Sequence, residues 1–286
     1  MQKITSILAV VEQSASGISV LDKAIALARC FRARIELLIA DSLLTQEFAS
    51  RCTALHYDEV TLYSLFRSGE PLHRLLCRHV LERRPDLLIK APSGGHPLKK
   101  WSLHANDREL ASECPVPVLL AGPKRWETPL RVAAAVDVSD HETAVVARSI
   151  LQAAGFLALG LHGNLDILYS EREERDETLR MERAVKIAQL VREFHVGCER
   201  LQMFDGPPEK RLPPLVTTRQ YDLLVLGAVS HTEGQRFGNE NLSSTLVDAT
   251  PGDVVLVKAS DIVTTTSRGR ATLVRQEVSD QCEELV

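Results

Sequence analysis

Short apolar runs alternate with amphipathic helical segments along most of this chain. Ile4 to Val11 (ITSILAVV), Arg34 to Ala40 (RIELLIA) and Leu87 to Ala91 have the composition of buried strands. Ser19 to Phe31 and Pro71 to Glu82 instead carry apolar residues at helical spacing. Continuous apolar strands separated by helices are typical of a parallel sheet covered on both faces. The pattern therefore predicts an α/β fold with right-handed crossovers between parallel strands.

The segments between these elements are less regular. Gln13 to Gly17 is small and polar, which favours a loop, and Val60 to Phe66 predicts a third strand. Asp41 to Asp58 is weakly periodic and has room for one short helix. The first part of the chain is thus predicted to run β-α-β-(α)-β-α-β-α-β.

A clear strand, loop, helix and strand unit lies near the other end of the chain. Tyr221 to Val229 is an uninterrupted apolar run, and Ser230 to Gly238 is a polar loop. Asn239 can cap the helix that follows, and Val254 to Val257 closes the unit as a second buried strand. In open α/β sheets, ligands bind at loops that follow the carboxyl ends of strands. The loop after Gly227 is therefore the first candidate binding site.

The same pattern occurs twice in the chain. Arg84 to Lys90 (RPDLLIK) parallels Gln220 to Leu226 (QYDLLVL), and Cys114 to Leu120 parallels Thr250 to Leu256. Both pairs align at an offset of 136, without a gap. We interpret the chain as a tandem duplication. The predicted division is a first domain at 1–121, a linker at 122–129, a second domain at 130–259 and a polar tail at 260–286.

The start of the second copy aligns at a different offset. Arg131 to Asp137 (RVAAAVD) restarts the strand pattern, and Asp137 matches Glu12 at an offset of 125. The second copy must therefore hold 11 more residues between its first and fourth strands. We expect them in a long helix from about Arg172 to His195.

Composition narrows the class of protein. The 286 residues carry a net charge of −4 with 25% charged residues and no long basic block, so no nucleic-acid partner is implied. No apolar run approaches the ~18 to 20 residues needed to span a bilayer, so no membrane partner is expected. The cysteines include no CxxC pair and indicate a reducing, cytoplasmic location. They are Cys30, Cys52, Cys77, Cys114, Cys198 and Cys282.

The two halves resemble universal stress proteins. Each begins with a strand that ends in an acid, Glu12 or Asp137, and the strand ending at Gly227 is followed by Phe-Gly-Asn239 and a helix. The tandem arrangement and the Cys-Pro-Val-Pro-Val start of the last strand of the first half look most like the E-type tandem subfamily. The resemblance covers residues 1 to about 260.

The resemblance implies two five-stranded parallel-sheet domains of the adenine nucleotide alpha hydrolase-like type. It implies strand order 3-2-1-4-5 in each, which places Asp137 and Gly227 on either side of one crevice. Single-domain members pair through their last strands. Here Val116 to Ala121 and Val254 to Lys258 would form that pair within one chain, giving an intramolecular pseudo-dimer with homodimers optional.

Family members that bind ATP use a Gly-x-x-Gly, nine residues, Gly-Ser/Thr pattern at this crevice, where backbone amides and a helix N-terminus hold phosphates. This sequence departs from that pattern. Ser230 occupies the position of the second glycine, and Asn239 replaces Ser or Thr. Seven residues, rather than nine, separate Ser230 from Gly238. In the first half the strand ends Lys90-Ala91-Pro92 and the pattern is absent. The sequence predicts a poor triphosphate site.

Five residues remain as candidates for binding a nucleotide: Asp137, Gly227, Ser230, Gly238 and Asn239. Asp137 could bind a ribose or adenine edge. Alternatively, its carboxylate could cap the next helix or be solvated at the end of its strand. The glycines could equally serve only the turn, and Asn239 could serve only as a cap.

We predict no catalytic residue and no metal site. His73 and Cys77 stand at i, i+4 on one expected helix, but no second ligand pair follows at a recognisable spacing. Ser230 and His231 are adjacent without a nucleophile elbow around them.

The resemblance therefore favours a non-catalytic binding or regulatory module in a cytoplasmic stress response, with unknown protein partners. Two alternatives stay open. One is an ATP-binding protein, with slow hydrolysis possible, that uses the second crevice; the other is a binder of a different small ligand there. The sequence establishes no cofactor, and ATP is the candidate to test.

Overall fold

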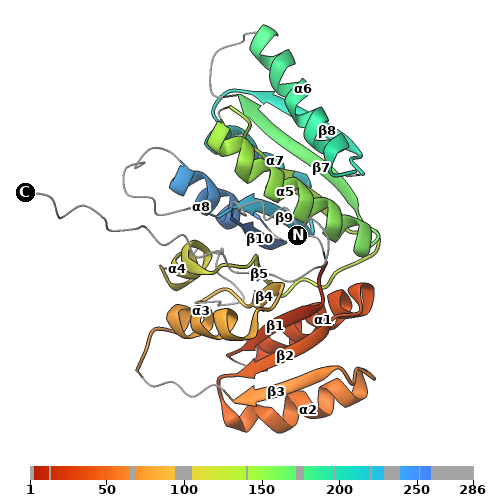
Figure 1. Ribbon diagram of the computed structural model, residues 1–286, viewed down its shortest axis with the longest axis vertical. Helices are drawn as coiled ribbons and strands as arrows, with labels where there is room; N and C mark the ends of the chain where they lie inside the picture. Colours follow the sequence, from red (N-terminus) through yellow and green to blue (C-terminus); the bar gives the residue numbers. More distant parts are fainter. Residues whose placement is uncertain are drawn as a thin grey trace, which may run out of the picture.

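The fold is built on one ten-stranded sheet in the residues that the structure describes. In this computed structural model these are residues 3–12, 14–64, 69–93, 105–139, 141–171, 177–195, 197–219, 221–228, 239–250 and 252–258. The strand order is β3-β2-β1-β4-β5-β10-β9-β6-β7-β8. We call the part from β1 to β5 the first half and the part from β6 to β10 the second half. Each half has the predicted order 3-2-1-4-5. Figure 1 shows the second half above the β5–β10 junction and the first half below it.

Strands and helices alternate through the first half as the apolar pattern predicts. Its elements are β1 (Ser6–Val11), α1 (Ser14–Phe31), β2 (Arg34–Ile39), a 3-10 turn (Ser42–Leu44), α2 (Thr45–Ala54), β3 (Val60–Ser64), α3 (Leu72–Arg83), β4 (Leu87–Lys90), α4 (Ala105–Glu113) and β5 (Val118–Leu120).

The second half repeats this order. Its elements are β6 (Arg131–Ala135), α5 (His141–Gly160), β7 (Asn164–Glu171), α6 (Glu177–Glu193), β8 (Arg200–Asp205), α7 (Pro208–Arg219), β9 (Leu223–Gly227), α8 (Asn239–Ala249) and β10 (Asp253–Val257). The extra residues of this half lie partly in α6, which has 17 residues where α2 has 10.

Helices cover both faces of the sheet. Apolar side chains of α1, α2, α5 and α6 pack on one face, and those of α3, α4, α7 and α8 pack on the other. Strand side chains alternate between the two clusters, so Ile89 faces the first set of helices and Leu88 the second. This two-sided burial explains why the central strands are apolar at nearly every position.

The two halves join through their last strands, as the pseudo-dimer hypothesis predicts. β5 and β10 pair antiparallel, with Val254 opposite Leu120 and Leu256 opposite Val118. Every other strand pair in the described sheet is parallel. The domain boundaries at 121/122, 129/130 and 259/260 remain predictions, and the tail at 260–286 lies outside the described residues.

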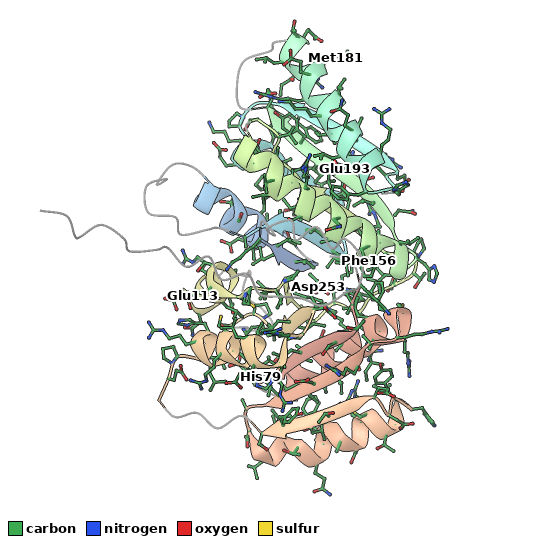
Figure 2. All side chains as sticks on the ribbon, viewed as in Figure 1. His79, Glu113, Phe156, Met181, Glu193 and Asp253 are labelled. Carbon is green, nitrogen blue, oxygen red and sulfur yellow. The ribbon has the colours of Figure 1, made fainter. Side chains whose placement is uncertain are left out.

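A buried ion pair joins residues of the two halves at this junction. Lys23 on α1 lies 2.7 Å from Asp253 at the start of β10, and the two residues are 3% and 1% exposed. Asp253 also accepts hydrogen bonds from the Gly122 backbone N–H at 2.6 Å and from Trp126 Nε1 at 2.7 Å. Lys23 donates to the Gly122 carbonyl at 2.6 Å. One carboxylate thus ties α1, the linker and β10 together, near the middle of the molecule (Figure 2).

Burial disfavours both charges of this pair. It lowers the pKa of Lys23 and raises the pKa of Asp253, and their mutual attraction opposes each shift. The pair therefore sets the geometry of the junction at an electrostatic cost, as buried ion pairs commonly do.

Two sequence expectations need correction. Gln13 to Gly17 is not a loop throughout, because α1 begins at Ser14. Gly17 lies inside the helix, where an added Cβ would come within 2.5 Å of Val11 Cγ1 and 2.7 Å of Phe48 Cζ. Here glycine permits a close helix–strand contact and does not mark a turn.

The second correction concerns membrane-spanning potential. Thr143–Gly160 on α5 is long and apolar enough to cross a membrane by length and composition, with a mean hydropathy of 1.4. In the described residues this is the one such window, and 44% of it is buried inside the protein. Its Ala147, Leu151 and Ala154 are fully buried in the core that also holds β6 and β9 side chains. We interpret α5 as a core helix.

Candidate functional site

Asp137 and Gly227 lie at the same edge of the sheet. β6 and β9 are parallel neighbours, with Val132 opposite Leu223 and Ala134 opposite Val225. Gly227 is the last residue of β9, and Asp137 follows the end of β6 by two residues. The structure therefore has the strand arrangement of a topological switch point, where α/β sheets bind ligands.

Asp137 has a local structural role. Its side chain is half-buried, and its Oδ1 accepts a hydrogen bond from the Ser139 backbone N–H at 2.9 Å. This two-residue contact is an Asx turn, which directs the chain from β6 into α5. The carboxylate thus has a contact within the strand-to-helix connection, and its assignment to a nucleotide site remains a prediction.

The packing of α5 leaves no room for a side chain at Gly227. A Cβ added at Gly227 would lie 2.8 Å from Val146 Cγ1, which is closer than real carbon atoms approach. The Gly227 carbonyl accepts a hydrogen bond from the Ser243 hydroxyl of α8 at 3.1 Å. The absence of a side chain at this position is thus explained by the helix above it, whether or not a ligand binds.

The other three candidates are described less fully. Asn239 is the first residue of α8, whereas the sequence predicts it as the cap of a helix that starts one residue later. Ser230 and Gly238 lie outside the described residues, so their assignment to a site remains a prediction.

In the first half, a buried lysine lies at the equivalent edge. Lys90 ends β4, beside the strand that leads to Glu12, and it is 1% exposed. Its ammonium group donates to the Ala91 carbonyl at 2.6 Å, to Ser93 Oγ at 3.2 Å and to Asp107 Oδ1 at 2.8 Å. Glu12 Oε1 lies 3.7 Å away. Lys90 thus has a partner for each of its three donor positions.

Asp107 completes this group from α4. It is 1% exposed and lies in the first turn of the helix. Besides Lys90, it accepts hydrogen bonds from the Ser93 backbone N–H at 2.7 Å and from Ser93 Oγ at 2.9 Å. A helix N-terminus, a backbone amide and a lysine are the groups that hold a phosphate in α/β proteins. Here Lys90 and the Ser93 backbone N–H hold a carboxylate of the chain itself, that of Asp107.

The second half replaces this ion pair with neutral residues. At the offset of 136, Leu226 stands in place of Lys90 and Ser243 in place of Asp107. Ser243 donates to the Gly227 carbonyl, as Lys90 donates to the Ala91 carbonyl. The two edges share one backbone contact but differ in charge, so they are not equivalent as binding sites.

Sequence reasoning missed Lys90 and Asp107 as partners. The available signal was Lys90 at the end of the otherwise apolar run RPDLLIK, since a lysine that closes a buried strand needs a carboxylate nearby. Finding the partner required the fold, because Asp107 is 17 residues away across the loop. No cluster of three or more potential metal ligands occurs among the described residues.

Three comparisons place this architecture among known proteins. No family model and no curated protein matches the chain at the sequence level. Among solved structures, a candidate universal stress protein from Pseudomonas aeruginosa matches with a TM-score of 0.75 at 23% identity, covering 90% of this chain and 94% of that one. A universal stress protein from Archaeoglobus fulgidus matches with a TM-score of 0.67 at 18% identity, covering 89% and 98%.

The same fold also occurs in a different setting. The cytoplasmic domain of a prokaryotic cation chloride cotransporter matches with a TM-score of 0.58 at 12% identity, covering 89% of this chain and 95% of that domain. The chain therefore has the tandem α/β fold seen in universal stress proteins. Because that fold is shared with part of a transporter, function has to be argued from the site.

Proposed function

We propose that this chain is a tandem universal stress protein that acts as a non-catalytic binding or regulatory module in a cytoplasmic stress response. The fold and the resemblance of both halves support the family. The stress role follows from that likeness alone, and protein partners are the expected targets.

The observation that carries the proposal is the Lys90–Asp107 pair, which bears on nucleotide binding in the first half. An incoming phosphate would have to displace a carboxylate that already accepts hydrogen bonds from Lys90 and from Ser93, all inside the protein. Removing one member of a buried pair costs about 3–5 kcal/mol, so this displacement is unfavourable. We infer that the first half does not bind a nucleotide at this edge.

The asymmetry between the halves supports one alternative. The second half has no such ion pair at the aligned positions, and Asp137 is half-buried beside the end of β9. A single nucleotide or another small ligand would therefore bind at the second edge, with Asp137, Gly227, Ser230, Gly238 and Asn239 as its candidate contacts. Slow ATP hydrolysis belongs to this alternative only.

Calorimetric titration of the full chain with ATP and Mg²⁺ separates the two proposals. We expect no binding in the micromolar range. Micromolar binding that Asp137→Ala abolishes, and that Lys90→Leu leaves unchanged, would contradict the main proposal and favour the nucleotide-binding one. Native mass spectrometry of freshly purified protein would reveal a different retained ligand as extra mass.

A further inference from the structure

Helix α3 contacts its neighbours through two histidines that lie against glutamates. His73 Nδ1 lies 2.9 Å from Glu109 Oε2, and His73 Nε2 lies 3.9 Å from Glu113 Oε2; both glutamates belong to α4. Further along α3, His79 Nε2 lies 3.5 Å from Glu36 Oε2 of β2. Figure 2 labels His79 on α3 and Glu113 at the end of α4. The first histidine thus joins α3 to α4, and the second joins it to the sheet.

These close contacts lack hydrogen bonds. In the described part of the chain, four buried side-chain polar atoms have no hydrogen-bond partner. Three of them are His73 Nδ1, His79 Nε2 and Glu36 Oε2, and the fourth is Thr45 Oγ1. The two histidine side chains are only 7% and 17% exposed. A neutral imidazole therefore gains little from the glutamate beside it, whereas an imidazolium gains an electrostatic attraction that does not need hydrogen-bond alignment.

His73 has a carboxylate near each of its ring nitrogens. A neutral imidazole carries a proton on one nitrogen and a lone pair on the other, so one of the two glutamates always lies beside a lone pair. Protonation removes this mismatch and puts a positive charge 2.9 and 3.9 Å from the two carboxylates. Their attraction opposes the cost of burying that charge. Glu113 also interacts electrostatically with Lys258 of the second half, so Glu109 is the main partner of His73.

His79 faces a carboxylate that is incompletely paired. Glu36 is 7% exposed, and the other cation beside its Oε2 is Arg83, whose Nε lies 3.9 Å away. Tyr63 of β3 packs against both cations. Its ring centroid lies 6.1 Å from that of His79 and 4.9 Å from the guanidinium carbon of Arg83. A charged His79 would supply Glu36 with the close partner that it lacks.

The second half pairs the equivalent carboxylate without a histidine. Asp166 is the third residue of β7, as Glu36 is of β2. It accepts hydrogen bonds from the Tyr221 hydroxyl at 2.8 Å and from Gln202 Nε2 at 2.9 Å. Arg219, which aligns with the arginine beside Glu36, lies 3.7 Å away. Both halves therefore keep an acid and an arginine here, and only the first half leaves the acid without a hydrogen bond on Oε2.

We propose that His73 and His79 make the packing of α3 dependent on pH, so that acidification binds this helix more tightly to α4 and to β2. An imidazole is the side chain whose charge ordinarily changes between about pH 8 and pH 5. As the pH falls, each histidine gains a charge that attracts the glutamates beside it. The second half lacks this response, because the residues aligned with the two histidines are Glu209 and Leu215.

The response bears on the edge of the first half that contains Lys90. Asp107 and Glu109 lie on the same helix, and Asp107 accepts a hydrogen bond from Lys90 at 2.8 Å. A tighter contact between α3 and α4 therefore helps to keep the Asp107 carboxylate on Lys90. In the proposed regulatory module, acid would rigidify the first half and leave the second half unchanged. The pH response itself does not depend on that regulatory role.

Hydrogen exchange of the full chain, measured by mass spectrometry at about pH 7.5 and about pH 5.5, tests the proposal across the range in which imidazoles titrate. Each rate is corrected for the intrinsic effect of pH on exchange. We expect the amides of α3 and α4 to gain several-fold protection at the lower pH, relative to those of α7 and α8. The aligned helices of the second half thus serve as an internal control.

Variants assign the response to the named groups. His73→Gln combined with His79→Gln should abolish the gain, because both side chains then stay neutral. Glu109→Gln combined with Glu113→Gln changes side chains that are 45% and 49% exposed. This pair should remove the gain of α4 and leave part of that of α3, which His79 still supports. The control His195→Asn removes an exposed histidine of the second half and should leave the gain intact.

The native chain alone can overturn the proposal, even if a variant fails to fold. The same ratio of protection between the two halves at both pH values would do so. A gain that persists without His73 and His79 would also overturn it, because another group would then be titrating. ATP binding by the native chain would contradict the proposed function but would leave this result unaffected.

Discussion

Phe31 and Phe156 stack face to face across the junction of the two halves, with their ring centroids 4.6 Å apart and 11° between the ring planes. They are equivalent residues of the repeat, at the offset of 125 that also relates Glu12 to Asp137. Leu119 and Val255, related by the offset of 136, likewise lie opposite each other in β5 and β10. Both pairs join a residue to its own copy, which is the mark of a two-fold axis.

The stacked rings should contribute to holding the halves together. We predict that Phe31→Leu and Phe156→Leu each destabilise the chain, and that the double variant loses less than the sum of the two. A coupling of about 0.5–1.5 kcal/mol is typical of an aromatic pair. Urea unfolding of the four proteins in a double-mutant cycle measures it. Strict additivity would mean that the rings do not interact in solution.

The Lys90–Asp107 pair can be tested by replacing its two residues with those at the aligned positions of the second half. Lys90→Leu alone should cost about 3–5 kcal/mol of unfolding free energy, because it leaves the Asp107 carboxylate buried without its cation. Adding Asp107→Ser installs the residues of the second half at both positions and should recover most of this loss. Denaturant unfolding of the single and double variants is the measurement. A double variant as unstable as the single one would show that the pair is not the source of the effect.

The Lys23–Asp253 pair predicts a pH dependence. Burial raises the pKa of Asp253, and Lys23 opposes that rise, so Lys23→Met should raise it further. An acid with a raised folded-state pKa contributes stability below its unfolded value and loses it as the pH rises through the folded-state pKa. The destabilisation by Lys23→Met should therefore be larger at about pH 8 than at about pH 5.

Unfolding of this variant and of wild type at the two pH values measures the effect. Lys23→Met combined with Asp253→Asn serves as the control, because it removes the titrating carboxyl and should show little difference between the two pH values. An equal loss of stability at both pH values in the single variant would contradict the assignment.

Gly227 tests whether its lack of a side chain serves packing. Gly227→Ala places a carbon 2.8 Å from Val146 Cγ1 and should destabilise the chain. A cost of about 1–3 kcal/mol is usual for overpacking. Val146→Ala removes the obstructing methyl groups and should relieve part of the penalty in the double variant. Thermal unfolding of the three variants decides this, and a Gly227→Ala chain as stable as wild type would show that the contact relaxes freely.

The sequence was sufficient for the alternation of strands and helices and for the repeat, because both depend on features that recur locally, whereas the order of strands in the sheet came from the family resemblance. Asp86 and Asp222 illustrate this. Asp86 accepts the Thr5 and Ser6 backbone N–H groups at 2.7 and 3.0 Å, and Asp222 accepts the Arg131 N–H at 2.9 Å. Each aspartate ties its fourth strand to the start of its first strand, so the duplicated Asp-Leu-Leu motif kept a duplicated role.

The candidate site could be predicted only in part. Asp137 and Gly227 lie at the same edge of the sheet because of the strand order. The family resemblance implied that order. The contacts of Gly227 with α5 and the charges around Lys90 depend on how helices distant in sequence approach the strands. Local patterns carry no information on those distances. The loop predicted at Gly17 was wrong for the same reason.

A designed cross-link at the two-fold axis tests most directly that two copies of one fold close on each other within a single chain. Leu119 and Val255 face the same core cluster, whereas Val254 faces the other one. Directly opposite strand residues have Cα atoms about 4.5–5.5 Å apart, within the range of a disulfide. We predict that Leu119→Cys with Val255→Cys yields, on oxidation, a linked peptide within one chain, and that Leu119→Cys with Val254→Cys does not. Cross-links found only between two chains, or in neither variant, would contradict the intramolecular pseudo-dimer.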